Sequence, residues 1–344
     1  MTSRPARPRS SSHPAVRRRG KKPAWTLALL VAAIGGVVAA TQPAQLTALV
    51  PAPSPHPEGP VATAEPAGIS RAVDLTVALP GDSVAMPLEL GPDSAGLHYE
   101  WVAVGDTVRP GFMLPLIGFP LYAPGKPGYY HLALMRDSQR VVLSEPMLAV
   151  MVPFQEKRAG WLNGYRIGTY PGERNGVSSH PDGFLVLQRS DTDLKVSTHL
   201  RLGDFMAHDG QRAVWPKYLA LDPRLLDKLE LVVSELERRF SRMGDMQLQI
   251  DVHSGFRTPS YNRTVPLAAD ESRHQFGDAA DVTFDANGDG LTTRADIAAI
   301  VQAVDTVEAQ HPDLAGGLGI YTSRRYSIPY VHIDTRGERM RWRG

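Results

Sequence analysis

Residues 272–281 read SRHQFGDAAD, and residues 330–334, near the end of the chain, read YVHID. The first block places His274 and Asp281 seven residues apart, with a glycine and two alanines between them that let the backbone turn closely. The second block adds His332. Two neutral imidazoles and a carboxylate form a three-ligand set for zinc that leaves a position open for water. Such a metal lowers the pKa of its water and polarises a carbonyl, as amide hydrolysis requires. On spacing alone, ordinary surface or core positions remain the alternative.

The composition of the 344-residue chain restricts what such a site can be made of. The chain has no cysteine, which excludes a disulfide framework, a thiolate zinc site and a cysteine nucleophile, so histidines and carboxylates must hold any metal. Its 42% hydrophobic and 21% charged residues favour a packed core and exclude global disorder. The net charge of +1 hides an asymmetry, because residues 1–41 carry eight Lys and Arg and no acid. The acidic remainder argues against nucleic acid as the main partner.

The first 50 residues are typical of a membrane-targeting segment. Residues 1–23 form a basic tail, and residues 24–50 are uncharged with an apolar centre from Trp25 to Ala40. Such a centre is about as long as the shortest bilayer-spanning helices, and basic residues before it predict a cytoplasmic tail and an exported body. Small residues at 38–40 also allow cleavage, so a transmembrane signal anchor and a signal peptide both remain open. We expect the body at the periplasmic or extracytoplasmic face, anchored to the inner membrane if the helix is retained.

The rest of the chain divides into a linker and two domains by its pattern. Residues 51–68 form a Pro-rich linker, since five prolines between Pro51 and Pro60 favour an extended chain. Residues 69–154 have short apolar runs cut by Pro and Gly, which predict a small all-β, immunoglobulin-like sandwich. Residues 155–344 predict an α+β domain in which antiparallel pairing is expected. The expected elements are strands over 73–77, 98–103, 129–134, 147–152, 247–252 and 330–334, and helices from Pro223 to Phe240 and over 294–310.

Four ordered blocks resemble the zinc D-Ala-D-Ala carboxypeptidases and the related murein metallo-endopeptidases, whose fold is shared with the hedgehog signalling domain. The blocks are residues 254–262 (SGFRTPSYN), 272–281, 316–321 (GGLGIY) and 331–337 (VHIDTRG). Residues 164–218 look more loosely like the upstream segment of some exported members, and the β domain is not covered. The resemblance implies an exported zinc peptidase that hydrolyses peptidoglycan stem peptides, as a D,D-carboxypeptidase or a cross-link endopeptidase.

Carried over by position, the resemblance also implies roles for individual residues. Arg257 would bind a substrate carboxylate or stabilise the developing oxyanion, with a structural salt bridge as the alternative. Ser272 would orient a ligand or the substrate, and Tyr321 would either line the cleft or belong to the core. His253 could line the cleft, could be exposed to solvent, or could contact a metal ligand without binding the metal itself. The implied zinc ligands are His274, Asp281 and His332.

The four blocks do not determine which residue serves as the general base. Some relatives carry Glu, Asp or His three residues before the last zinc histidine, where this chain has Pro329. Asp334 lies two residues after His332 in an expected strand, so both side chains would point to the same face. Asp334 could be the base or the acceptor that fixes the imidazole, and Glu271 and Asp278 are weaker candidates. Pro329 also keeps open a different class of function, a non-catalytic cell-wall-binding protein that retains the zinc scaffold.

A second candidate metal site begins four residues after Asp281. Residues 285–296 read DANGDGLTTRAD, with oxygen ligands and a sixth-position glycine at the spacing of a calcium loop. The loop resembles those of dockerin modules, which also close with Asp, and an Asn/Gly-rich turn is the alternative. Calcium would clamp the strand carrying Asp281 to the helix that follows. The ligands would be Asp285, Asn287, Asp289, the Leu291 carbonyl, Thr293 and Asp296.

Overall fold

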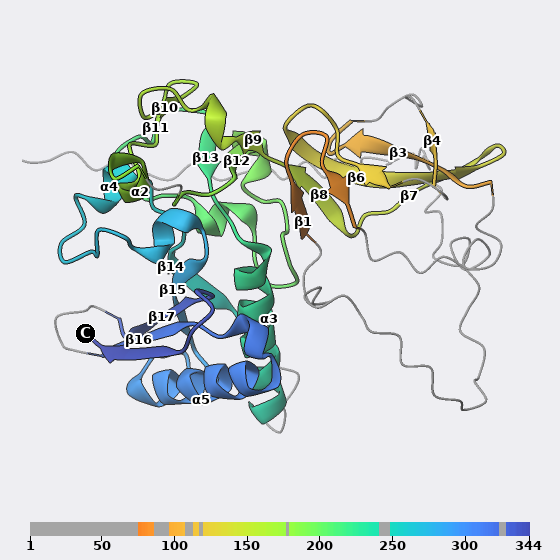
Figure 1. Ribbon diagram of the computed structural model, residues 1–344. Coiled ribbons are helices and arrows are strands. Elements are labelled where there is room, and N and C mark those ends of the chain that lie inside the picture. Colours follow the sequence, from red (N-terminus) through yellow and green to blue (C-terminus); the bar gives the residue numbers. More distant parts are fainter. Residues whose placement is uncertain are drawn as a thin grey trace, which may run out of the picture. The chain divides into compact units, whose positions relative to one another are not determined.

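The computed structural model describes residues 75–85, 96–106, 113–116, 120–176, 179–240, 248–322 and 328–344. These residues form a mixed α+β structure, as the sequence predicts (Figure 1). The expected basic tail 1–23, membrane segment 24–50 and linker 51–68 lie outside them. Within the described ranges, no helix has the length and apolar character needed to cross a bilayer.

The described residues from 75 to 150 contain strands and turns. A six-stranded sheet has the order β1-β8-β6-β3-β4 with β7 paired to β6, and β2 pairs with β5 in a separate sheet. Only β1 and β8 pair in parallel among these strands. The four strands expected in this region overlap β1, β3, β6 and β8. The strands are β1 (Leu75–Ala78), β2 (Ser83–Val84), β3 (His98–Ala103), β4 (Leu114–Pro115), β5 (Leu121–Tyr122), β6 (Gly128–Arg136), β7 (Gln139–Val142) and β8 (Met147–Val150).

The described residues between 152 and 219 form a less regular layer that contacts the chain in the blocks 254–262 and 272–281. In this layer β12 pairs with both β9 and β13. The buried Tyr170 hydroxyl donates to the Gln275 carbonyl at 3.0 Å, and the Ser260 amide donates to the Ile167 carbonyl at 3.0 Å. These two hydrogen bonds connect the layer to the backbone at residues 260 and 275. The main elements are β9 (Val152–Pro153), β10 (Trp161–Leu162), β11 (Tyr165–Arg166), α2 (Pro171–Arg174), β12 (Gly183–Leu187) and β13 (Lys217–Leu219).

A five-stranded sheet with the order β14-β15-β17-β16-β18 carries the motifs. Its pairs are antiparallel, as expected, except that β18 runs parallel to β16. Both expected helices of this region are present, and the Asp222 carboxylate caps the first by accepting from the Arg224 amide at 2.9 Å. The elements are α3 (Pro223–Phe240), β14 (Ile250–Ser254), α4 (Pro259–Asn262), β15 (Ala279–Phe284), α5 (Arg294–Gln310), β16 (Gly317–Tyr321), β17 (Tyr330–Asp334) and β18 (Met340–Arg343).

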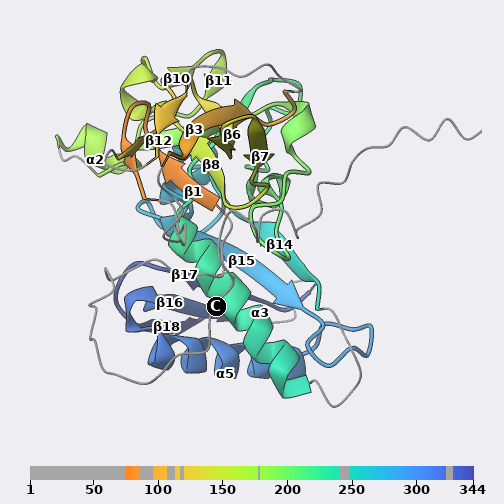
Figure 2. The ribbon, with the colours of Figure 1, turned by 90° about the vertical axis from the view of Figure 1, so that its right-hand side faces the viewer.

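The two faces of this sheet have different neighbours. Figures 1 and 2 show α5 running along one face, where Val282, Val331 and Ile333 join one buried core with apolar side chains of α3 and α5. Because side chains alternate along a strand, His332 and Asp334 project from the opposite face. The helices therefore cover the apolar face and leave the polar side chains of β15 and β17 on the other. The helix residues in that core include Leu225, Leu229, Val232, Leu236, Ile297, Ile300, Val304 and Val307.

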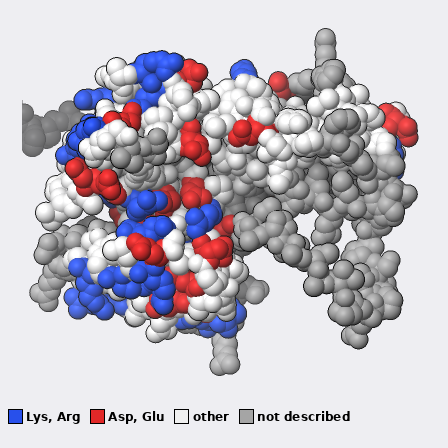
Figure 3. Space-filling model, viewed as in Figure 1, with Lys and Arg blue, Asp and Glu red and all other residues white. Residues whose placement is uncertain are grey.

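Charged side chains of both signs lie together over α5 and β18. On the face shown in Figure 3, basic and acidic groups are interspersed over this part of the molecule. Asp305 of α5 pairs with Arg339 at 2.6 Å and with Arg341 at 2.8 Å, and Glu308 pairs with the same two arginines. These ion pairs fasten the C-terminal strand to α5.

Gly277 sets the position of the turn that precedes β15. This residue ends the short 3-10 helix Arg273–Phe276 with a φ of +78°, which only glycine adopts at little cost. A Cβ at Gly277 would collide with the Ala220 carbonyl. The glycine thus allows the turn carrying His274 to pack directly on the chain that leads into α3.

We predict that Gly277→Ala destabilises the protein by about 3 kcal/mol. The positive φ costs about 1–2 kcal/mol for alanine, and the collision with Ala220 adds a similar amount. Urea unfolding of both proteins measures the difference. Gly164→Ala is the control, because Gly164 has a φ of +81° but no atom within 4 Å of an added Cβ. Equal losses in the two variants would contradict the packing contribution.

Candidate metal centre

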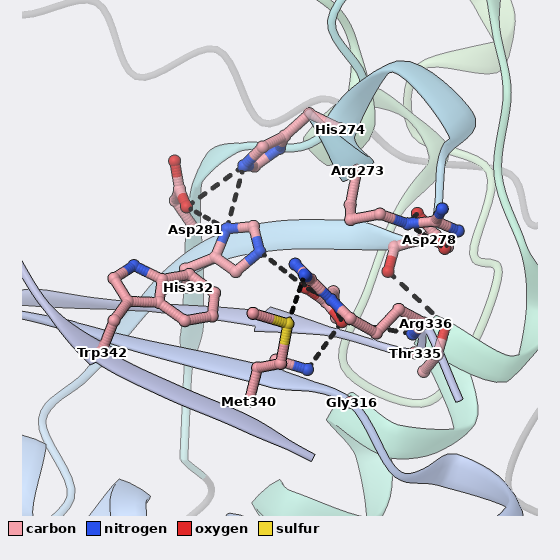
Figure 4. Close-up of polar contacts among 12 residues, drawn as sticks. Arg273, His274, Asp278, Asp281, Gly316, His332, Thr335, Arg336, Met340 and Trp342 are labelled. Carbon is pink, nitrogen blue, oxygen red and sulfur yellow. Dashed lines mark hydrogen bonds and ion pairs between the residues drawn. The ribbon is translucent and has the colours of Figure 1, made fainter. Parts of the chain in front are cut away.

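Three side chains converge on the face of the five-stranded sheet that is opposite α5 (Figure 4). Asp281 of β15 and His332 of β17 are direct partners in the strand register, and His274 comes from the 3-10 turn before β15. His274 Nε2 lies 3.2 Å from Asp281 Oδ1 and 3.1 Å from His332 Nδ1, and His332 Nδ1 lies 2.9 Å from Asp281 Oδ1. All three residues are buried. The structure therefore brings together the three residues that the sequence proposes as ligands.

Hydrogen bonds behind the two imidazoles determine where their protons lie. His274 Nδ1 is 2.7 Å from the Gly255 carbonyl oxygen, which can only accept, so Nδ1 carries the proton. His332 Nε2 is 3.1 Å from Asp334 Oδ2, so Nε2 donates to that carboxylate. In neutral rings the two nitrogens that face each other therefore both present lone pairs. Together with Asp281 Oδ1 they make three acceptors without a donor between them, and a cation at their centre relieves the repulsion.

The spacing of these three atoms suits a tetrahedral metal ion. Bonds of about 2.0–2.1 Å place neighbouring ligand atoms of a tetrahedron about 3.3 Å apart. The observed separations of 2.9–3.2 Å are only slightly shorter. The group could hold a metal ion through two imidazole nitrogens and one carboxylate oxygen. Each imidazole also has the hydrogen-bonded acceptor that orients histidine ligands in metal sites.

Burial and the close contacts shift the pKa values of the cluster. Burial lowers the pKa of His274 and keeps this imidazole neutral, although Asp281 opposes the shift. Burial also acts to lower the pKa of His332, but the Asp281 and Asp334 carboxylates, which accept hydrogen bonds from the protonated ring, outweigh it and raise that pKa. The pKa of Asp281 is held well below its usual value, because both histidines overcome the opposing effect of burial. The carboxylate is therefore ionised and His274 neutral, which are the forms that bind metal.

Asp334 lies behind His332 rather than beside the converging atoms. Its side chain is fully buried and accepts from the Gly317 amide at 2.7 Å and from Arg336 Nε at 3.0 Å, in addition to His332 Nε2. Burial acts to raise the pKa of Asp334, but the bonds from His332, Arg336 and Gly317 lower it. The nitrogen that Asp334 contacts faces away from the cluster. Of the two roles considered from the sequence, this geometry favours holding the imidazole over serving as the base.

Arg257 contacts the cluster directly. Its Nη2 donates to Asp281 Oδ2 at 2.6 Å, its Nε donates to Ser254 Oγ at 2.8 Å, and its amide donates to the His274 carbonyl at 3.0 Å. The guanidinium thus holds the second oxygen of the Asp281 carboxylate, a candidate metal ligand, in the salt bridge considered as an alternative from the sequence. Its binding of a substrate carboxylate or oxyanion stays a prediction.

The remaining candidates lie around the cluster without joining it. Ser272 is half-buried at the start of the 3-10 turn, and no hydrogen bond from its hydroxyl to the cluster occurs within the described residues. Asp278 is paired with Arg273, and Glu271 is exposed. The half-buried Tyr321 ring stacks on Tyr330 with centroids 4.6 Å apart.

Trp342 of β18 is a neighbour of the cluster that sequence reasoning missed. Its ring covers Gly319, the register partner of His332, and its centroid is 5.2 Å from that of His332 (Figure 4). Trp342 Nε1 donates to the Tyr321 hydroxyl at 2.9 Å. The glycine at 319, in the middle of a strand, was the available signal, because it marks a close approach by another group.

The candidate calcium loop is held by its own side chains. The Asp285 carboxylate accepts from the Gly290 amide at 2.7 Å and from the Asp289 amide at 3.1 Å, and Asp289 Oδ1 accepts from the Leu291 amide at 2.9 Å. Asn287 Oδ1 also accepts from the Asp289 amide, at 3.0 Å. At the end of the loop, the buried Asp296 accepts from the Thr293 amide at 2.7 Å and the Ala286 amide at 3.1 Å, in a capping box that begins α5. The loop is thus compact, and nothing in it identifies the ion.

Comparison with known proteins finds no family model, no curated protein and no solved structure that matches this chain. The fold and site define an α+β protein with a buried His-Asp-His group able to hold a metal ion. Its function must therefore be inferred from the chemistry of that group and from the sequence.

We predict that Asp334→Asn weakens divalent transition-metal binding by about 10–100-fold, because the charged acceptor that orients His332 becomes a neutral amide. Competition for Zn²⁺ or Co²⁺ against a chromophoric chelator measures the affinity. Asp313→Asn is the control, since Asp313 is exposed in the 3-10 turn Pro312–Leu314 and does not belong to the cluster. Wild-type affinity in a folded Asp334→Asn variant would show that this carboxylate does not position the ligand.

Proposed function

We propose that this protein is an exported zinc peptidase that hydrolyses peptidoglycan stem peptides, with a C-terminal domain of the hedgehog and D,D-peptidase type. The observation that carries the proposal is the convergence of three atoms that can bind a metal ion, His274 Nε2, Asp281 Oδ1 and His332 Nδ1, within 3.2 Å of one another. Two imidazoles and a carboxylate, with no cysteine in the chain, are a donor set that suits catalytic zinc. The four sequence blocks supply the choice of substrate.

The residues around the centre have properties that suit peptide hydrolysis. Bound zinc would supply an activated water and a Lewis acid for the scissile carbonyl. Arg257 places a positive charge beside Asp281, where it can attract a terminal carboxylate or stabilise negative charge on a carbonyl oxygen. Asp334 keeps His332 in the tautomer whose Nδ1 faces the centre. Both a D,D-carboxypeptidase and a cross-link endopeptidase use these features.

Export of the body to its substrate is supported by the sequence of the first 50 residues. A basic tail followed by an uncharged apolar run is the pattern of a signal anchor or signal peptide. We place the peptidase domain at the periplasmic or extracytoplasmic face, next to the cell wall. The absence of cysteine makes the domain independent of disulfide formation after export.

We expect the zinc-loaded protein to cut purified muropeptides, and His274→Ala to reduce the cutting to background. Mass spectrometry of the products identifies the bond, since release of terminal D-Ala and cleavage of a cross-link give different masses. His208→Ala is the matched control, because His208 is exposed and has no ligand spacing. Binding of muropeptides without turnover by the wild type would contradict the peptidase and support a non-catalytic wall-binding protein instead.

We further propose that residues 285–296 bind a structural calcium ion. Support comes from the alternating oxygen side chains, the glycine at position 6 and the compact backbone that Asp285 and Asp289 hold together. The loop joins β15, which carries Asp281, to α5. Calcium there would fix the end of the strand that supplies a zinc ligand.

Saturating calcium should raise the melting temperature of the zinc-loaded protein by about 5 °C or more. Calcium at 100 times its Kd stabilises the native state by about 2.7 kcal/mol, and each kcal/mol shifts Tm by about 2–4 °C in a domain of this size. Differential scanning calorimetry measures the shift, with Mg²⁺ as the ion control. The double variant Asp285→Asn/Asp289→Asn should lose the response. An unchanged wild-type Tm in calcium would overturn the assignment.

A further inference from the structure

The acidic groups nearest the metal centre are already engaged. Peptide hydrolysis needs a side chain that takes a proton from the attacking water and gives one to the leaving nitrogen. Asp334 lies behind His332, and Asp281 uses one oxygen in the cluster and the other for Arg257. Asp278 is paired with Arg273. A proton-transfer group that is free of these pairings has to be sought among the other side chains on this face of the sheet.

His253 lies on that face, beside the row of ligands. In the register of β14 with β15, Val252 pairs with Val282 and Ser254 pairs with the next residue, Asp281. His253 is therefore the extra residue of a bulge-like irregularity between these two pairs. Such bulges redirect a side chain and are common next to active sites. His253 is thus one residue away from the direct partner of a candidate ligand.

A ring contact confirms the direction of the His253 side chain. Its imidazole meets the Tyr330 ring edge-on, with centroids 6.2 Å apart. Because β15 lies between β14 and β17, the two rings can meet only across β15, on the face from which Tyr330 projects. Tyr330 and His332 share that face, since they are two residues apart in β17. The imidazole of His253 therefore lies over β15, on the side of the metal cluster.

The two nitrogens of His253 have different surroundings. Nδ1 is 3.6 Å from Asp251 Oδ2, so a carboxylate on the same strand faces one edge of the ring. Nε2 is buried and has no hydrogen-bond partner within the described residues. A buried polar nitrogen without a partner calls for an explanation, and a functional role is one of the recognised ones. A carboxylate at one nitrogen, with the other left for the reacting group, is the arrangement of an acid–base histidine.

We propose that His253 is the acid–base residue of this site, with Asp251 as its positioning residue. As the water oxygen bonds to the scissile carbonyl carbon, Nε2 takes the proton that the water loses. As the carbon–nitrogen bond breaks, Nε2 returns this proton to the leaving nitrogen, so that the products are a carboxylic acid and an amine. The inference rests on the proposed peptidase function, and it adds the proton-transfer group that the sequence blocks do not contain.

The test compares His253→Gln with the wild type and with the control His208→Gln, all loaded with zinc. We expect kcat for muropeptide cleavage to fall by about 100-fold or more in His253→Gln, with KM little changed. Metal affinity, measured by chelator competition, should stay at the wild-type value because His253 is not a ligand. Asp251→Asn should lower kcat by a smaller factor. In His253→Gly, added imidazole should restore part of the lost kcat, which a merely structural role would not allow.

The outcomes separate this inference from the proposed function. Cleavage by the wild type together with an unchanged kcat in His253→Gln would overturn the role of His253 and leave the peptidase intact. A fall in metal affinity in His253→Gln, or no rescue by imidazole in a folded His253→Gly variant, would show a ligand or structural role instead. A wild type that binds zinc and muropeptides but cuts neither bond would overturn both.

Discussion

The close approach of three buried polar atoms that can bind a metal ion is the constraint on which the rest of this structure depends. His274 Nε2, His332 Nδ1 and Asp281 Oδ1 approach within 3.2 Å because each imidazole turns its proton away from the others. The Gly255 carbonyl receives one proton and Asp334 receives the other. Burying two imidazoles and a carboxylate this close together costs desolvation free energy, so the surrounding fold must hold the three residues in place. The five-stranded sheet and the two helices packed on it hold these three residues in position.

A buried ion pair connects both helices to the strand that carries His332. Lys228 of α3 donates to Glu308 of α5 at 2.8 Å and to the Asp334 carbonyl at 2.7 Å, and both charged side chains are fully buried. Burial lowers the pKa of Lys228, and its bonds to Glu308 oppose that shift. Breaking such a pair leaves an uncompensated buried charge at a cost of about 3–5 kcal/mol. The same helices that cover the apolar face thus fix the backbone beside the candidate metal ligands.

Two glycines and an irregularity in β14 allow other groups to approach the His-Asp-His cluster. Gly277 lets the turn bearing His274 pack on the chain at Ala220, and Gly319 leaves room for the Trp342 ring next to His332. The irregularity in β14 turns His253 over β15. Each feature brings a group from a distant part of the chain against the cluster. Rigid elements therefore position the candidate ligands, while glycines and a bulge admit the groups that surround them.

Local patterns in the sequence were sufficient for the helices, and together with the resemblance of four sequence blocks they indicated the candidate ligands. The periodicity after Asp222 and after Thr293 predicts α3 and α5, because one apolar face and a capping residue are local properties. The spacing of His274 and Asp281, with the distant His332, predicts a set of ligands that the fold does bring together.

Only the tertiary structure decided what each neighbour of the ligands does. Alternation places Asp334 on the same face as His332, but the Gly317 amide and Arg336 determine that its carboxylate lies behind the ring. Strand β18 has only four residues, in which Met340 and Trp342 alternate with arginines, and so short a pattern does not predict its parallel pairing with β16 or the position of Trp342. The ion pair of Arg257 and the direction of His253 likewise depend on contacts between strands. Such pairings join residues that are far apart in the chain, so local sequence patterns do not predict them.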